Sequence, residues 1–250
     1  MSQNEWKYLQ KTLRIVKYSL NNQLLSLTNH FLLVSSKMKS TTTDLCRLCS
    51  IVKNRHINGI ADKPIYETPN YIVIPSIGAF IDGWVMIVPR KHVYDMSKLY
   101  EDDEFSRLAL KIYKYIEEKF GRPVMFEHGA SYSGSPTGCG VDHAHFHFVP
   151  FVESLLEDLK ETRLLWQKCI ASEITNKSTG RDYLFYSETP PTLSKINGYL
   201  HIVDRPVSQF FRKILARKTG NELISDYKNF PLLEKTHRTA LVLQDLRLIG

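Results

Sequence analysis

The chain has 250 residues, of which 43% are hydrophobic and 24% charged, proportions that exclude a disordered chain and are typical of a globular protein. A net charge of +7 suits a protein that handles polyanions such as nucleotides or nucleic acid. No apolar run approaches the length of a membrane span, so we expect no membrane partner. The four cysteines, without a secretory signal, indicate a reducing compartment rather than a disulfide framework.

Residues 1–42 are rich in lysine and arginine and almost free of acidic residues. Three interpretations remain open: a docking helix, an organelle presequence, or a dispensable extension that precedes Met38. We expect an N-terminal helix with a polar linker, separate from the rest of the chain. The apolar residues at roughly helical spacing are Trp6, Leu9, Leu13, Val16 and Leu20.

Cys46 and Cys49 form a Cys-x-x-Cys pair. Alone, such a pair is ambiguous between redox chemistry, zinc binding and chance. No second pair follows, so a zinc site here needs histidines as its remaining ligands.

Three strands are predicted next, at residues 65–67, 71–75 and 84–88, from β-branched and apolar runs bounded by turn signals. A long helix is then predicted over residues 101–120, because an apolar stripe recurs at helical spacing and acidic residues crowd its first turn. Gly121 is expected to end this helix.

A strand at residues 123–126 leads into a loop, residues 130–140, that is rich in glycine, serine and threonine. Three histidines follow the loop, at positions 143, 145 and 147, and they alternate with apolar residues. This period of two predicts a strand with all three imidazoles on one face. A row of imidazoles on a core strand indicates that the rings bind a metal, a phosphate or one another. The acidic residue before this row, Asp142, has no assigned role.

Beyond Pro150 we predict a helix over residues 155–170, strands at residues 183–186 and 198–203, and helices over residues 208–217 and 234–246.

The histidine row resembles the motif of the histidine-triad (HIT) superfamily of nucleotide hydrolases and transferases, in its zinc-binding form with a C-terminal extension. The Cys-x-x-Cys pair, the segment 83–92 and the loop that contains Gly138 and Gly140 occur in the order typical of the superfamily. The resemblance covers about residues 45–151. It implies an α+β fold, in which a HIT-like antiparallel β-sheet carries a long helix, plus a C-terminal α/β extension. The implied domains are 1–42, 43–152 (catalytic) and 153–250 (packed on the catalytic domain).

The resemblance also implies site residues. Structural zinc would be bound by Cys46, Cys49, His92 and His143. His145 would be the nucleophile that forms a nucleotidyl-histidine intermediate, and His147 would hydrogen-bond and position the phosphate. Ile72, Ile74 and Phe80 could line a base pocket, although plain core packing is the favoured interpretation for each. Substrate contacts, including backbone N–H groups that cradle the α-phosphate, would come from Glu127, His128, Gly138, Cys139, Gly140 and Gln209, with Arg212 as a further phosphate contact.

The function implied is a nucleotidyl hydrolase or transferase that cleaves a nucleoside phosphate or dinucleoside polyphosphate at the α-phosphate, in phosphoric anhydrides or phosphoramidates. The third histidine favours hydrolysis, because uridylyltransferases of the superfamily have glutamine there. Two alternatives stay open: an aprataxin-like deadenylase of nucleic-acid ends, and a non-catalytic, CwfJ-like RNA-processing module. The expected partner is a nucleotide or dinucleotide, and nucleic acid and a homodimer are left open. We expect a cytoplasmic location, with nuclear and organellar locations not excluded.

Overall fold

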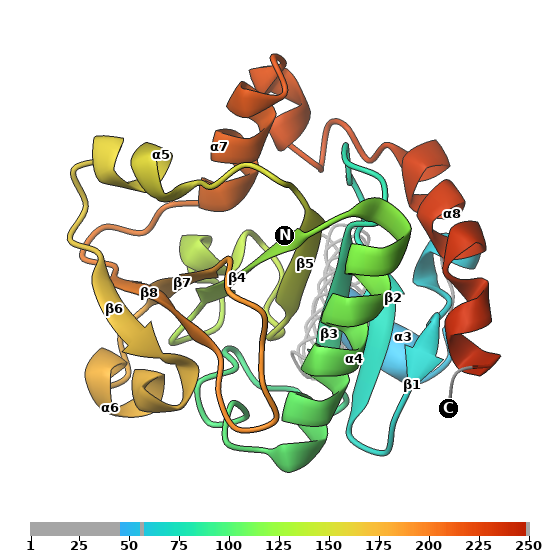
Figure 1. Cartoon of the computed structure of the whole chain (residues 1–250), viewed down its shortest axis with the longest axis horizontal. Coiled ribbons are helices and arrows are strands. Elements are labelled where there is room, and N and C mark those ends of the chain that lie inside the picture. Colours follow the sequence, from blue (N-terminus) through green and yellow to red (C-terminus); the bar gives the residue numbers. More distant parts are fainter. Residues whose placement is uncertain (1–45, 56–57, 249–250) are drawn as a thin grey trace, which may run out of the picture. The chain divides into compact units, whose positions relative to one another are not determined.

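A computed structural model describes residues 46–55 and 58–248, with the side chains of 247 and 248 left undescribed (Figure 1). The predicted N-terminal helix and linker lie outside these residues. Among the helices of the described part, none has both the length and the hydrophobicity that crossing a membrane requires.

The described residues form an eight-stranded sheet that is antiparallel at every pairing, with the order β1-β2-β3-β5-β4-β7-β8-β6. This arrangement of helices on an antiparallel sheet confirms the α+β class. The strands are β1 (Tyr66–Glu67), β2 (Tyr71–Pro75), β3 (Val85–Pro89), β4 (Pro123–Gly129), β5 (Phe146–Pro150), β6 (Gln167–Ile170), β7 (Tyr183–Ser187) and β8 (Asn197–Ile202).

The long helix α4 (Asp103–Phe120) covers one face of the sheet. Asp102 begins it as N-cap, with its carboxylate accepting from the N–H of Glu104 at 2.8 Å, and Gly121 ends it at a φ of 95°. Side chains at every second strand position, such as Ile87 and Phe146, pack under this helix.

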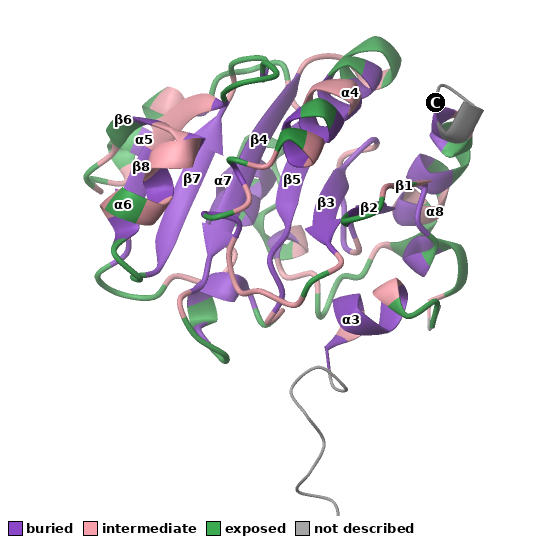
Figure 2. Ribbon diagram, turned by 90° about the horizontal axis from the view of Figure 1, so that it is seen from below, coloured by how far each residue is buried: buried purple, intermediate pink, exposed green. Residues whose placement is uncertain are grey.

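The other face is covered by two shorter helices, α3 (Arg47–Val52) and α7 (Phe210–Lys218). Figure 2 shows α4 and α3 on opposite sides of the strands, which are buried along most of their length. The intervening positions of the same strands face this second side, among them Met86 under α3 and Phe126 under α7. The histidines of the site belong to this side.

The chain after residue 152 adds helices and strands to the same sheet. β7 pairs directly with β4, so strands from both sides of the predicted boundary at residue 152 share one sheet. The division into domains stays a prediction. The remaining elements are α5 (Leu156–Glu161), α6 (Ile174–Ser178), α8 (Leu233–Val242) and the short 3-10 helices η1 (Gly59–Asp62), η2 (Pro136–Gly138), η3 (Ala171–Glu173), η4 (Glu222–Ser225) and η5 (Gln244–Leu248).

Two predictions about elements are wrong. The helix expected over residues 155–170 ends at Glu161, and its second half is the edge strand β6, which pairs with β8. This non-local pairing overrides the local helical pattern. The histidine row is not one strand either, because β5 begins at Phe146. The backbone before Phe146 forms its hydrogen bonds outside the sheet, since the N–H of Ala144 donates to the carbonyl of Val93 at 2.7 Å.

Candidate active site and metal centre

Two thiols and two imidazoles converge beside β3. The ligand atoms of Cys46, Cys49, His92 and His143 all lie within 4.8 Å of one another, and this set can hold a metal ion. Cys46 is the N-cap of α3 and its Sγ accepts from the N–H of Cys49 at 3.5 Å, so the first turn of the helix brings both thiols to one side. Nδ1 of His143 lies 3.6 Å from Sγ of Cys46 and 3.4 Å from Sγ of Cys49, and Nδ1 of His92 lies 3.1 Å from Sγ of Cys49.

The ring of His143 is oriented by the main chain. Its Nε2 donates to the carbonyl of Pro89 at 2.8 Å, so its Nδ1 keeps a lone pair on the side of the thiols. Burial lowers the pKa of His143 to about 4, against the opposing effect of this hydrogen bond, and the neighbouring rings of His92 and His145 lower it as well. A neutral imidazole with its second nitrogen held by a carbonyl is the usual form of a metal ligand.

His145, two residues on, has the opposite arrangement of its ring nitrogens. Its Nδ1 donates to the carbonyl of His143 at 2.8 Å, so Nε2 carries the lone pair. Burial lowers the pKa of His145 and the charge of Arg47 lowers it too, while the hydrogen bond to the carbonyl raises it. The ring is therefore neutral, with an available nucleophilic nitrogen.

His147 lies on β5 and is oriented by an indole that the sequence reasoning missed. Nε1 of Trp84 donates to Nδ1 of His147 at 3.0 Å, so the proton of the neutral ring sits on Nε2. Burial holds the pKa of His147 well below its usual value, and His145, His128 and Arg212 lower it as well. The rings of His145 and His147 lie 4.8 Å apart between centroids. One ring thus offers a lone pair and its neighbour offers a proton.

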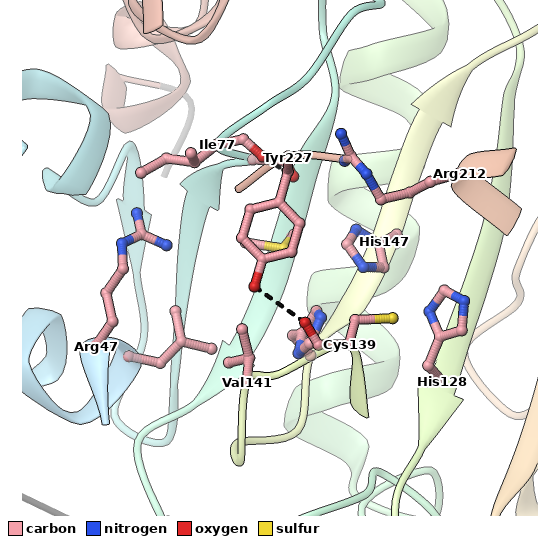
Figure 3. Close-up of a pocket in the computed structure, with 12 residues that line it drawn as sticks. Arg47, Ile77, His128, Cys139, Val141, His147, Arg212 and Tyr227 are labelled. Atoms are coloured by element: carbon pink, nitrogen blue, oxygen red, sulfur yellow. Dashed lines mark hydrogen bonds between the residues drawn. The ribbon is translucent and has the colours of Figure 1, made fainter. Parts of the chain in front are cut away.

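These two rings line a cavity of about 50 Å³ (Figure 3). Ile72, Ile74 and Phe80, the candidates for a base pocket, do not line it. They are buried in the core, the two isoleucines beside α3 and Phe80 beside α7. The lining residues are Arg47, Leu48, Ser76, Ile77, Met86, His128, Cys139, Val141, His145, His147, Arg212 and Tyr227.

Arg212, from α7, brings a buried positive charge to the cavity. Its Nε donates to the carbonyl of Ser225 at 3.0 Å, a second guanidinium nitrogen donates to the carbonyl of Gly78, and the group lies 4.7 Å from the ring of Trp84. Burial lowers the pKa of Arg212 to about 10, which leaves it charged at neutral pH. No carboxylate lines this cavity among the described residues, so the cavity favours an anion.

His128 extends the row of imidazoles onto β4. Its Nε2 accepts from the N–H of Phe211 at 3.4 Å, and its buried Nδ1 has no hydrogen-bond partner among the described residues. Burial lowers the pKa of His128 to about 3, with further lowering by His145 and Arg212. Nδ1 is therefore the N–H of a neutral ring and can donate to an oxygen in the cavity.

The predicted backbone cradle needs a correction. Within the loop that contains η2, the N–H of Gly138 donates to the carbonyl of Ser135 at 3.1 Å, and that of Cys139 to the carbonyl of Pro136 at 3.0 Å. Of the three residues proposed for the cradle, Gly140 alone keeps an N–H that makes no hydrogen bond to another described residue. The N–H groups of Gly138 and Cys139 therefore form hydrogen bonds within the tight turn.

Cys139 itself lines the cavity with a neutral thiol. Burial raises its pKa to about 11, and its Sγ accepts from the N–H of Gln209 at 3.0 Å. Gln209 was expected to contact phosphate, but its side chain does not line the cavity. Its main-chain N–H joins α7 to the loop through this bond.

Glu127 is also placed differently from the prediction. Successive residues of a strand face opposite sides, so Glu127 faces α4 while His128 faces the cavity. Its carboxyl accepts from the N–H of Met96 at 2.6 Å and from the hydroxyls of Tyr100 and Tyr183 at 2.5 and 2.6 Å. Burial raises the pKa of Glu127 to about 8, and Asp95 raises it further, whereas the three bonds lower it. Its role in this structure is to tie the strand to the core.

Two carboxylates hold the loop between β4 and the histidines. Asp142, whose role the sequence left open, accepts from the hydroxyl of Ser133 at 2.7 Å and from the N–H of Gly134. Asp182 accepts from the N–H of Ser131 at 2.7 Å and from the hydroxyl of Ser135. Burial acts to raise the pKa of Asp182, but these hydrogen bonds outweigh it and hold the pKa below its usual range.

Sequence reasoning missed Trp84, Arg47 and Tyr227 as parts of this site. Arg47 lies between the two cysteines of the motif, and Trp84 begins the predicted strand at residues 84–88. The position of each residue in the sequence could therefore have identified it as part of the site. Tyr227 had none, because only the folding of the C-terminal segment brings it to the cavity.

No family model matches the chain, and no curated protein matches it. Among solved structures, a HIT family hydrolase from Clostridium thermocellum is similar, with 22% sequence identity and a TM-score of 0.30. The match covers 43% of this chain and 91% of that chain.

Proposed function

We propose that this protein is a HIT-type nucleotidyl hydrolase or transferase that acts at the α-phosphate of a nucleotide. The observation that carries the proposal is the pair of neighbouring imidazoles with opposite protonation. The carbonyl of His143 leaves a lone pair on Nε2 of His145, and the indole of Trp84 leaves a proton on Nε2 of His147.

In the proposed reaction, Nε2 of His145 attacks the α-phosphorus and the bond from phosphorus to the leaving group breaks. The ring becomes a phosphorylated cation, which the carbonyl of His143 stabilises through the proton on Nδ1. Nε2–H of His147 donates a hydrogen bond to the leaving atom and stabilises the negative charge that develops there. Arg212 and Nδ1–H of His128 stabilise charge on the phosphoryl oxygens. Water, or an acceptor phosphate, then attacks the nucleotidyl-histidine and frees His145.

We further propose that the metal of the Cys₂His₂ cluster is structural zinc. Two thiolates and two neutral imidazoles form a closed tetrahedral set, the composition typical of structural zinc. With Zn–S near 2.3 Å and Zn–N near 2.0 Å, tetrahedral geometry places sulfur and nitrogen ligands about 3.5 Å apart. The sulfur-to-nitrogen distances here, from 3.1 to 3.6 Å, fit that geometry. Bound zinc would fix the main chain at His143, and with it the carbonyl that orients His145.

The test is a panel of nucleotides followed by mass spectrometry of the intact protein. We expect an acid-labile adduct of one nucleoside monophosphate on the wild-type protein and none on His145→Ala. Unchanged turnover by His145→Ala would contradict the covalent mechanism. If His145→Ala and the wild type bound nucleotide equally and neither turned it over, the result would support a non-catalytic binding module instead.

A further inference from the structure

The cavity is large enough for a phosphoryl group but too small for a whole nucleotide. Its volume of about 50 Å³ has room for a few water-sized groups, whereas sites for whole ligands of drug size are about 300–1,000 Å³. A phosphoryl group beside His145 and His147 therefore fills it, and the rest of the substrate must lie at the rim. The groups at the rim decide which leaving group the protein accepts.

One side of the rim is a segment of the C-terminal part, residues 225–231, which we call the closing segment. Hydrogen bonds attach it to other described residues: the carbonyl of Ser225 accepts from Arg212 at 3.0 Å, the hydroxyl of Tyr227 donates to the carbonyl of Cys139 at 3.0 Å, and the carbonyl of Pro231 accepts from Gly78 at 2.7 Å. Gly78 has a φ of +70°, and a Cβ there would overlap Tyr227, so glycine permits the close approach.

Lys228, the next residue of the closing segment after Tyr227, lies over the loop beside the histidines. A Cβ built on Gly140 would lie 2.7 Å from Nζ of Lys228, and Gly140 has a φ of +79° that favours glycine. Nζ makes no ion pair or hydrogen bond within the described residues, and neither does the N–H of Gly140. The nearby carboxylate of Asp226 accepts instead from the N–H of Lys228 and from Asn229. A free ammonium and a free amide thus lie side by side at the rim.

Arg47 carries a second charge at the rim, from the first turn of α3. Figure 3 shows the ring of Tyr227 between Arg47 and Arg212. The guanidinium of Arg47 pairs with the buried Asp62 but lines the cavity, and its side chain is 29% exposed. Arg47 lines the same cavity as Tyr227 and His145, which places its charge within electrostatic reach of a group bound next to the attacking nitrogen.

We propose that Lys228, the N–H of Gly140 and Arg47 form an anion subsite for the leaving group, so that the substrates are nucleoside polyphosphates or dinucleoside polyphosphates. This inference rests on the proposed function of His145. When the bond from the α-phosphorus to the bridging oxygen breaks, the leaving phosphate or nucleotide gains one negative charge, which the subsite stabilises. A phosphoramidate that is protonated on its nitrogen releases a neutral amine, so no new negative charge forms for Lys228 to stabilise.

The test compares two substrates that share one nucleoside monophosphoryl group: a dinucleoside tetraphosphate and a phosphoramidate with an uncharged amine. Lys228→Met should lower kcat/KM for the tetraphosphate about tenfold, the value of one charge-assisted hydrogen bond, and change it less than about twofold for the phosphoramidate. Lys228→Arg should keep most of the activity. The matched control is Lys195→Met, at an exposed position in the turn between β7 and β8. An equal loss on both substrates, or a loss on neither, would overturn the proposal.

A binding measurement separates this inference from the proposed function. Calorimetry with inorganic tripolyphosphate should show binding about tenfold weaker in Lys228→Met than in the wild type, with no change in Lys195→Met. If tripolyphosphate binding depends on Lys228 but no nucleotide is turned over, the proposed function fails and the anion subsite stands. If turnover requires His145 but the affinity for tripolyphosphate is the same in Lys228→Met as in the wild type, the anion subsite is wrong and the proposed function stands.

Discussion

The indole nitrogen of Trp84 donates to Nδ1 of His147 across 3.0 Å, and this bond sets which nitrogen of His147 holds its proton. Trp84 is fully buried and also lies under the guanidinium of Arg212. A tryptophan that reads as ordinary core in the sequence therefore positions a residue of the candidate active site.

Replacing Trp84 with Phe should expose this relationship. The change removes the donor, so the neutral ring of His147 loses its fixed tautomer and its pKa rises. We expect kcat to fall about 10- to 100-fold with little change in KM, and the acid limb of the pH–rate profile to move to higher pH. Trp166→Phe is the control, since Nε1 of Trp166 has no hydrogen-bond partner in the described part of the chain. An unshifted profile in Trp84→Phe would show that the indole does not set the proton position.

The two central histidines should respond differently to truncation. His145→Ala should abolish turnover while the protein keeps its metal and its melting temperature, because it removes the attacking nitrogen and no ligand. His147→Ala should lower kcat about 10²- to 10⁴-fold, the usual range for a proton donor or positioning group. Steady-state kinetics, metal analysis and thermal melts distinguish these outcomes, and a His145→Gly protein with near-normal turnover would contradict the covalent step.

Metal removal should act on stability. Purified protein should contain about one zinc ion per chain, and Cys49→Ser and His143→Ala should each lower both zinc content and melting temperature. Structural zinc contributes about 10 kcal/mol or more of binding free energy in small isolated domains, and a smaller effect is expected beside a large core. Cys169→Ser is the matched control, since this buried thiol bonds to the carbonyl of Ile170 outside the cluster. If metal analysis finds no zinc in protein that was purified without chelator, the proposal of a structural zinc site is contradicted.

Removal of the C-terminal part should damage the site itself. A chain ending at Asp204 lacks Arg212 and Tyr227, and it exposes the apolar surface that Phe211 covers. We expect loss of turnover or of solubility. Deleting residues 1–37 should leave turnover unchanged. Activity and sedimentation of the two truncated proteins check this, and the reverse pattern would show that the predicted domain boundaries are wrong.

Stability should fall in mild acid because of His128. Its pKa is lowered to about 3 in the folded protein, against about 6.5 when unfolded. Between these values the unfolded chain binds the extra proton, so stability is lost as pH falls through the window from about 6.5 to 3. Each pH unit within the window costs up to about 1.4 kcal/mol for this one group. Denaturant unfolding at pH 7 and pH 5 should show a smaller loss in His128→Asn than in the wild type; the metal contribution is shared by both proteins and cancels.

The sequence alone determined the features that depend on local pattern. The acidic first turn and apolar stripe predicted α4 to within two residues of its start, and Gly121 ends it as expected. The Cys-x-x-Cys pair indicated Cys46 and Cys49, and the resemblance to the histidine-triad superfamily implied His92 and His143; the structure brings these four residues together as one cluster. Such features are readable because helix period, caps and ligand chemistry are properties of nearby residues.

Tertiary structure decided which side chains meet. The alternation along β4 marks Glu127 and His128 as facing opposite sides, but only the packing of α4 shows that Glu127 belongs to the core and His128 to the cavity. The tight turn of η2 used the N–H groups of Gly138 and Cys139, which the motif alone had assigned to phosphate. Tyr227 reaches the cavity only because the C-terminal segment closes over it, through contacts that join residues far apart in the chain. Non-local packing of this kind leaves no periodic trace in a sequence, so the rim of the site could be read from the folded protein alone.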